Sequence, residues 1–258
     1  MSQAWNPELY LRYAAYRARP ADDLLPRIQL NVAGDVYDLG CGPGTLTKRL
    51  KDKWPDRRVT GVDSSADMLA AARDKFPRGI EWRQADIAAW APATPPALIF
   101  TNAALHWVPD HQALIPRLMN AIVAGGVLAF QIPESGSQPY HQCIERVTTS
   151  PRWRERLNGV HPHDDPLHPR AYYDLVAPLA ADIDVWETDY HHVLEGDDPV
   201  TEWISSTGLG PFLSVLSEAE KPAFLADYGA CAQAAYPRQA DGKVLFTMRR
   251  LFLLATRR

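Results

Sequence analysis

The sequence predicts a doubly wound α/β fold, in which helices cover both faces of a mostly parallel sheet. Three observations lead to this prediction. Short apolar runs alternate with amphipathic helical segments from about residue 34 to residue 131, a glycine-rich loop follows the first apolar run, and an acidic residue follows each of the next two. This alternation is typical of parallel βαβ units, whose strands bind ligands at their carboxyl ends. We therefore expect a small-molecule site along that rim of the sheet.

The expected strands are rich in Val, Ile, Leu, Phe or Trp and are bounded by Gly, Pro, Asp or Asn. They cover residues 35–39, 58–62, 80–84, 97–101, 127–131, 182–192 and 243–256. Apolar residues at helical spacing predict helices at 45–54, 65–76, 111–122, 200–206 and 218–236. The second of these begins with Ser64 and Ser65, and a serine hydroxyl at that place can cap the helix.

The domain organisation follows from the break in this pattern after Pro133. Prolines and glycines interrupt the next stretch, which indicates an insertion or a lid. We expect a single domain over residues 1–258. Its core would comprise residues 30–132, 181–192 and 243–258, and a helical cap would comprise residues 1–29, 133–180 and 193–242.

Composition narrows the class of partner. Hydrophobic residues make up 46% and charged residues 22% of the chain, and the net charge is −4. This balance is ordinary for a folded protein and supplies no basic surface for nucleic acid or membrane, so a small-molecule partner is expected. Residues 1–16 lack the continuous apolar core of a signal peptide, which favours a cytoplasmic location. The oligomeric state stays open.

The cysteines and histidines show no metal-ligand spacing. Cys41, Cys143 and Cys231 are far apart and form no CxxC pair, so we expect neither a disulfide framework nor a zinc site. The histidines between residues 161 and 192 lack a fixed i, i+4 pair with a nearby acid on a recognisable helix. We expect no bound metal.

The glycine-rich loop occupies residues 38–44, with the sequence Asp-Leu-Gly-Cys-Gly-Pro-Gly. Glycines are needed where the backbone turns sharply and a ligand approaches without meeting a β-carbon. The spacing Gly-x-Gly-x-Gly differs from the Gly-x-Gly-x-x-Gly of dinucleotide folds, and the loop lacks the Gly-Lys-Ser/Thr that wraps a triphosphate. A pyrophosphate ligand is therefore disfavoured.

Two acidic residues extend the loop into a nucleoside site. Asp63 ends the second strand, about twenty residues after the glycines, where its carboxylate can accept both hydroxyls of a ribose. Asp86 follows the third strand and can accept a hydrogen bond from an exocyclic amine, while Ile87 packs against a flat base. Together these residues indicate an adenosine site.

This combination of motifs resembles the class I S-adenosylmethionine-dependent methyltransferases over Val36 to Gln131. The resemblance implies a Rossmann-like sheet of about seven strands with S-adenosyl-L-methionine as the cofactor. It places Gly40 and Gly42 beneath the methionine moiety, Asp63 on the ribose and Met68 over the adenine. The full set of cofactor-binding residues that it implies is Tyr10, Arg19, Asp38, Gly40, Cys41, Gly42, Asp63, Ser64, Met68, Asp86, Ile87 and Asn102.

A closer resemblance covers nearly the whole chain. It includes Trp-Asn-Pro at 5–7, Asn-Ala-Ala-Leu-His-Trp-Val-Pro-Asp-His at 102–111, Ala-Tyr-Tyr-Asp at 171–174 and Arg-Leu-Phe at 250–252. These segments are similar to those of methyltransferases that esterify one carboxylate of trans-aconitate. The resemblance implies a small polycarboxylate substrate bound by His106, Trp107, Arg170, Tyr172, Tyr173 and Arg250. An ionised carboxylate is already a nucleophile, so no general base and no catalytic side chain is expected.

Several of these residues also have an ordinary structural explanation. The glycines could serve only a tight turn, Cys41 could be a small packing residue, and Met68 could be part of the core. Of Tyr172 and Tyr173, one could line the pocket while the other packs in the core, because neighbouring side chains point in different directions. Three alternative functions stay open: methylation of another small molecule, cofactor binding without catalysis, and a nicotinamide-dependent oxidoreductase.

Overall fold

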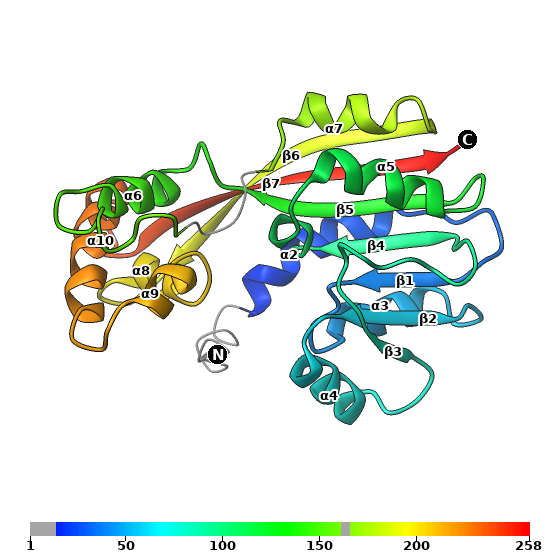
Figure 1. Ribbon diagram of the computed structural model, residues 1–258, viewed down its shortest axis with the longest axis horizontal. Coiled ribbons are helices and arrows are strands. Elements are labelled where there is room, and N and C mark those ends of the chain that lie inside the picture. The colour runs from blue at the N-terminus through cyan, green and yellow to red at the C-terminus, as the bar shows by residue number, and fades with distance from the viewer. Residues whose placement is uncertain (1–13, 161–165) are drawn as a thin grey trace. The chain divides into compact units, whose positions relative to one another are not determined.

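A computed structural model of the chain describes residues 14–160 and 166–258 (Figure 1). The chain forms two compact units. The α/β unit comprises Pro20–Pro133, Pro166–Thr188 and Arg250–Arg258, and the helical unit comprises Met1–Arg19, Glu134–Asp165 and Asp189–Arg249. The division differs from the expected core and cap at several segments. Residues 20–29, 133 and 166–180 belong to the α/β unit, and residues 189–192 and 243–249 belong to the helical unit.

The described residues form a seven-stranded sheet in the order β3-β2-β1-β4-β5-β7-β6. Its strands are β1 (Val36–Leu39), β2 (Val59–Asp63), β3 (Glu81–Gln84), β4 (Leu98–Asn102), β5 (Val127–Glu134), β6 (Ala180–Leu194) and β7 (Val244–Arg257). All seven expected strands are confirmed with small shifts at their ends. The strand order confirms the predicted Rossmann-like sheet of seven strands.

Strands β1 to β5 are parallel, whereas β7 runs the other way. Val36 of β1 lies opposite both Val59 of β2 and Leu98 of β4 in parallel register. At the other side of β5, the end of β7 meets the start of β5: Arg257 exchanges backbone hydrogen bonds with Gly125 and Gly126. The carboxyl ends of β1, β2, β3 and β4 therefore share one rim, as the sequence predicts.

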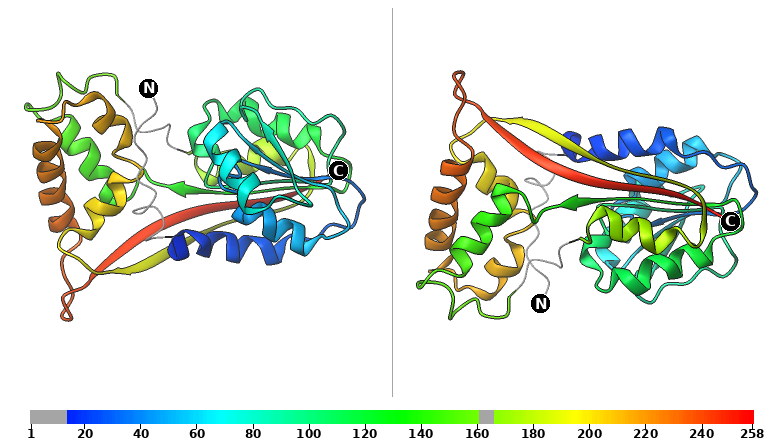
Figure 2. Two further views of the ribbon diagram at one scale, coloured as in Figure 1. Left: turned by 90° about the horizontal axis from the view of Figure 1, so that it is seen from below. Right: turned by 90° about the horizontal axis from the view of Figure 1, so that it is seen from above.

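Helices flank the sheet, and Figure 2 shows the part of α2 from Pro20 onward on one face and α5 and α7 on the other. The described helices are α2 (Ala14–Leu24), α3 (Thr45–Lys53), α4 (Ala66–Lys75), α5 (His111–Ala121), α6 (Pro139–Thr148), α7 (Pro169–Val176), α8 (Pro199–Ser205), α9 (Gly210–Val215) and α10 (Lys221–Ala235), with the 3-10 turns η1 (Leu25–Arg27) and η2 (Leu105–Trp107). Within the described residues, no helix is long and apolar enough to cross a membrane.

Local sequence explains where several helices begin. Ser65 caps α4, since its hydroxyl accepts the backbone N–H of Met68 at 3.3 Å, and Asp110 caps α5 in the same way through Ala113. Among the helices that the sequence analysis did not list, α6, α7 and α9 each carry a proline in the first turn. Proline is well tolerated there because that N–H has no helical partner. Prolines that indicate breaks in the sequence therefore mark helix starts in the structure.

The helical unit has its own core of aromatic side chains. The rings of His192 and Trp203 stack at 5.0 Å, and the Trp203 ring meets that of Phe246 edge-on at 5.6 Å.

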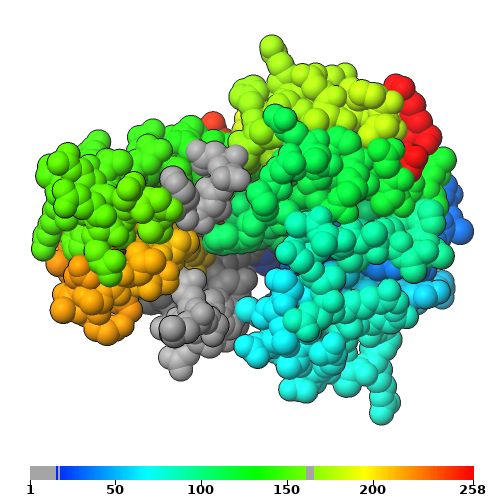
Figure 3. Space-filling view, viewed as in Figure 1, coloured from blue at the N-terminus to red at the C-terminus, as the bar shows by residue number. Residues whose placement is uncertain are grey.

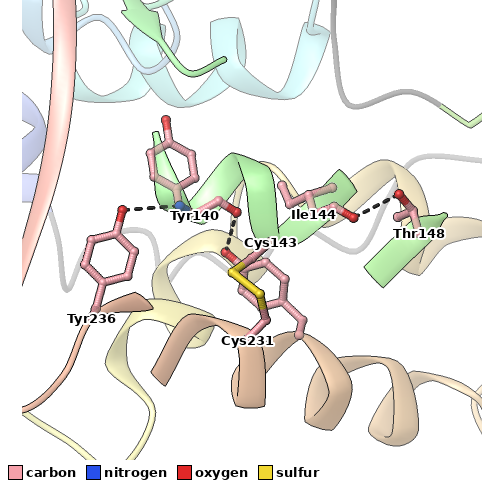
Figure 4. The surroundings of a disulfide bond; sticks show 7 residues. Tyr140, Cys143, Ile144, Thr148, Cys231 and Tyr236 are labelled. Atoms are coloured by element: carbon pink, nitrogen blue, oxygen red, sulfur yellow. Dashed lines mark hydrogen bonds between the residues drawn. A yellow bond between two sulfur atoms is a disulfide. The ribbon is translucent and has the colours of Figure 1, made fainter. Parts of the chain in front are cut away.

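The expectation that the cysteines form no disulfide is wrong. Cys143 of α6 and Cys231 of α10 form a disulfide bond (Figure 4). The cysteines are 88 residues apart in the chain, so no local spacing motif signals the bond. Only the packing of α6 against α10 brings them together.

Candidate functional site

The glycine loop follows β1 in a conformation that few other residues adopt. Gly40, Gly42 and Gly44 have φ angles of 74°, 52° and 78°, all in the left-handed region. A β-carbon on Gly40 would lie 2.2 Å from the Cβ of Ala104, so that position is closed by packing. A β-carbon on Gly42 would meet nothing within 4 Å. Gly42 therefore leaves open space above the loop, as a ligand requires.

Asp63 joins this loop to the next helix. Its Oδ2 atom accepts the backbone N–H of Gly42 at 2.8 Å, and its Oδ1 atom accepts that of Ser65 at 2.9 Å. Each carboxylate oxygen can accept a further hydrogen bond, so Asp63 can still bind hydroxyl groups of a ligand. The carboxylate thus orders the loop and the start of α4 and also faces the rim of the sheet.

A pocket of about 360 Å³ opens at this rim, a volume within the range of small-molecule sites. It is lined by Gly40, Asp63, Ser64, Asp86, Ile87, Ala103, Ala104, Trp107 and Val108. Six of these residues belong to the predicted cofactor and substrate sets. Sequence reasoning missed Ala103, Ala104 and Val108. The small size of the alanines directly after the fourth strand was the available signal, and Ala103 adopts a positive φ of 52°.

Asp38 lies beneath the loop and not in the pocket wall. It is 2% exposed, and its Oδ2 atom accepts the Thr47 hydroxyl at 2.6 Å. Burial raises the pKa of Asp38 to about 7, with the neighbouring Asp63 carboxylate adding to the rise and the Thr47 hydrogen bond opposing it. This carboxyl therefore changes its charge near neutral pH and holds the first turn of α3 against β1.

Cys41 is a packing residue in this structure. Its thiol is buried, and burial raises the pKa of the thiol well above its ordinary value, with the Asp38 and Asp63 carboxylates adding to the rise. A thiol with a raised pKa stays protonated and is a poor nucleophile. The remaining predicted cofactor residues lie close to the loop without lining the pocket: the side chain of Met68 is half-buried on α4, and the Asn102 Oδ1 atom accepts the Gln131 amide at 2.8 Å.

Two predicted cofactor residues lie elsewhere. Tyr10 is outside the described residues. Arg19 belongs to the helical unit, where it donates to the carbonyl of His191 at 3.2 Å and lies over the ring of Tyr190. A contact between Arg19 and the cofactor therefore stays a prediction.

The predicted substrate residues divide into buried and exposed side chains. Tyr172 is fully buried, and its hydroxyl donates to His111 Nδ1, because His111 Nε2 carries the proton that it donates to the Leu105 carbonyl at 2.9 Å. Of the two neighbouring tyrosines, Tyr172 therefore packs in the core, and a contact between Tyr172 and the substrate stays a prediction. Trp107 and Tyr173 are 52% and 49% exposed, respectively.

The remaining predicted substrate residues are two cations and a histidine. Arg250 is only 8% exposed and His106 only 7%, whereas Arg170 is exposed on α7. Neighbouring Arg249 is paired with Asp189, with its Nε atom 2.8 Å from Oδ1. Among the residues that the structure describes, no group of His, Cys, Asp and Glu has the arrangement of a metal site.

Comparisons with known proteins agree with this geometry. A family model described as a methyltransferase domain matches residues 36–126. The YcgJ protein from Bacillus subtilis shares the fold, with a TM-score of 0.58 at 12% identity over 95% of this chain and 99% of that chain. The chain thus contains a stretch that matches a methyltransferase domain, within an α/β fold with a seven-stranded sheet.

Relatives of nearly full length make the family specific. The trans-aconitate 2-methyltransferase of Azoarcus sp. (strain BH72) is 47% identical over 98% of this chain and 99% of its own length. The enzyme of the same name from Paracidovorax citrulli (strain AAC00-1) is 45% identical over 98% of both chains. The chain belongs to the trans-aconitate 2-methyltransferase family.

Proposed function

We propose that this protein transfers a methyl group from S-adenosyl-L-methionine to one carboxylate of trans-aconitate. The observation that carries the proposal is the pocket in which the glycine loop, Asp63 and the Asp86–Ile87 pair meet at one rim of the sheet. The full-length similarity to trans-aconitate 2-methyltransferases supports the acceptor. The two lines of support are independent, because one concerns the cofactor and the other the substrate.

The residues of the pocket fit the adenosine half of this cofactor. Asp63 presents a carboxylate with free lone pairs to which two ribose hydroxyls can donate. Ile87 is 8% exposed and gives an apolar surface for a flat base, and Asp86 beside it accepts hydrogen bonds from an amine. We propose that the methionine moiety lies over Gly40 and Gly42, and that Gly42 lets it approach the backbone, because the space where a β-carbon would lie is open there.

When bound, the cofactor supplies a methyl group on a positively charged sulfonium, which can pass to a carboxylate oxygen without a proton transfer. The protein therefore has to hold and align two reactants and keep water out, and needs no general base. Trp107 and Val108 give the pocket an apolar border that suits this task. The raised pKa of Cys41 agrees with a site that uses no thiol nucleophile.

A di- or tricarboxylate needs cationic partners, and arginine binds carboxylates in a bidentate manner. We propose Arg250 and Arg170 for this role, with His106, Trp107 and Tyr173 as further contacts. The proposed partner is therefore a small polyanion and not a nucleic acid, in agreement with the net charge of −4. We also propose a cytoplasmic location.

Methyl transfer across a panel of acids tests the proposal. The purified protein is incubated with S-adenosylmethionine and with trans-aconitate, cis-aconitate, citrate or isocitrate, and the methyl ester is located by NMR. We expect monomethyl trans-aconitate as the main product. Calorimetry adds the cofactor: S-adenosylhomocysteine should bind and NADH should not. Binding of NADH alone would refute the methyltransferase, and turnover of a different acceptor would refute only the substrate.

A further inference from the structure

The segment from Asp86 to Trp90 forms one wall of the pocket but is neither helix nor strand. Asp86 closes a tight turn here: its Oδ1 atom accepts the backbone N–H of Ala88 at 2.8 Å, and its carbonyl accepts that of Ala89 at 3.1 Å. The contacts at the carbonyls of Ile87 and Trp90 are partly buried, and buried carbonyl groups need hydrogen-bond donors. Another element supplies these donors.

Arg117 of α5 supplies these donors. Its Nη2 atom donates to the carbonyl of Ile87 at 2.8 Å and to that of Ala88 at 3.0 Å, and its Nη1 atom donates to the carbonyl of Trp90. In the space-filling view, the blue-green segment that follows β3 borders the green surface of α5 (Figure 3). The guanidinium reaches these carbonyls from two nitrogen atoms with fixed directions, whereas the three donors of a lysine ammonium all belong to one nitrogen at the end of a flexible chain.

The other anchors of this segment are apolar. Ile87 and Trp90 are 8% and 6% exposed, and the Trp90 ring meets that of Tyr37 edge-on at 5.0 Å. Asp86, by contrast, is exposed at the pocket and has no apolar anchor of its own. Its direction depends on the backbone of the turn, and that backbone is held by Arg117.

We propose that Arg117 is a positioning residue for the cofactor: by binding the carbonyls of the 87–90 backbone, it holds Asp86 and Ile87 where they meet the adenine. Arg117 is not among the residues that line the pocket, so it acts through this wall. The inference rests on the proposed function, because it takes the adenosine moiety as the group that the wall contacts.

The test compares two arginines that make the same kind of contact. Arg257 donates to the carbonyls of Met119, Asn120 and Ile122 at the end of the same helix, beside the start of β5 and hence at the opposite rim. Arg117→Met and Arg257→Met each remove a guanidinium from three carbonyls. Both variants should unfold at lower temperature than the wild type. Only Arg117→Met should bind S-adenosylhomocysteine more weakly, by about tenfold, as expected for a displaced hydrogen-bonding group.

Two further variants separate positioning from stability. Arg117→Lys keeps the charge and one donor and should recover part of the affinity, which also covers the case that Arg117→Met fails to fold. Asp86→Asn should weaken S-adenosylhomocysteine binding in the wild type but much less in the Arg117→Lys background, because the two residues act through one contact. In Arg117→Lys, with the cofactor saturating, turnover of the acceptor should change by no more than about twofold.

The outcomes distinguish the inference from the function on which it rests. Wild-type affinity in Arg117→Lys and Arg117→Met, an equal loss in Arg257→Met, or additive effects of Asp86→Asn and Arg117→Lys would each overturn the positioning role. In all three cases the wild type still binds S-adenosylhomocysteine. Failure of the wild type itself to bind would overturn the proposed function and the inference together.

Discussion

The two units of this protein are stabilised in different ways. In the α/β unit, polar contacts concentrate where strands end: Asp63 binds two backbone amides, Thr47 binds Asp38, and Arg117 binds three carbonyls. The helical unit relies on stacked aromatic rings and on a disulfide between two helices. The first arrangement presents polar groups in fixed directions around the rim pocket. The comparison teaches that changes in the α/β unit should alter ligand binding, whereas changes in the helical core should alter stability.

The largest expected effect is the loss of the disulfide. Replacing Cys143 and Cys231 together with Ser should lower the free energy of unfolding by about 2–5 kcal/mol, because the unfolded chain regains the freedom of an 88-residue separation. Urea denaturation with and without dithiothreitol measures this difference. The double variant serves as the control, since the reductant should leave its stability unchanged.

The affinity for S-adenosylhomocysteine should stay the same in this variant. A tenfold change in that affinity would contradict the separation between the units. Titration of thiols in the unreduced native and unfolded protein provides a direct check of the bond: one thiol, that of Cys41, should be found in the unfolded wild type. Three thiols would show that the cysteines are reduced, as is usual in a cytoplasm.

The next effect concerns the cofactor. Asp63→Ala should weaken S-adenosylhomocysteine binding by about 3 kcal/mol, roughly a hundredfold, because hydrogen bonds to a charged carboxylate are lost along with the order of the Gly42 loop. Calorimetry measures the affinity. Asp63→Asn is the matched variant, since it keeps the shape and one acceptor oxygen and should lose less. Unchanged affinity in Asp63→Ala would remove Asp63 from the site.

Arg249 and Arg250 allow the effects of substitutions in the two units to be compared at adjacent positions, because Arg249 belongs to the helical unit and Arg250 to the α/β unit. If the Arg250 guanidinium binds a carboxylate, Arg250→Ala should raise the KM for trans-aconitate roughly 10- to 100-fold. This factor corresponds to a loss of about 1.5–3 kcal/mol of binding free energy. Arg249→Ala breaks a half-exposed ion pair with Asp189 and should change the KM by less than about threefold. Equal effects of the two variants would argue against substrate recognition by Arg250. A loss of cofactor affinity in Arg250→Ala would place this residue at the cofactor instead.

The last expected effect is a pH dependence of stability. Because the pKa of Asp38 is raised to about 7, the folded protein holds this proton at pH values where the unfolded chain has released it. The contribution of Asp38 to stability is therefore fully present below about pH 4 and declines as the pH rises to about 7, by at most about 1.4 kcal/mol per pH unit. Asp38→Asn keeps an acceptor for Thr47 and should remove this slope. Denaturation of both proteins at several pH values tests it, and parallel pH profiles would contradict the shifted pKa.

The sequence by itself determined the strands, the helices between them and the centre of the site. The common rim of the strands follows from the βαβ units. The roles of the glycines and Asp63 can be inferred from their neighbours in the sequence, because a left-handed turn needs glycine and an acid at a strand end faces the same rim. The helices that begin with proline could also have been predicted from the sequence. A proline in the first turn is compatible with a helix, although a proline inside a helix breaks it.

Tertiary structure alone decided the features that depend on residues far apart in the chain. Tyr172 lies in the core because α7 packs on α5 and brings its hydroxyl to His111, 61 residues away. Cys143 meets Cys231 only across two packed helices, and Arg117 reaches the 87–90 backbone only because α5 lies against it. A single residue type at a single position does not specify such contacts. They arise from the packing of whole elements, which no local motif records.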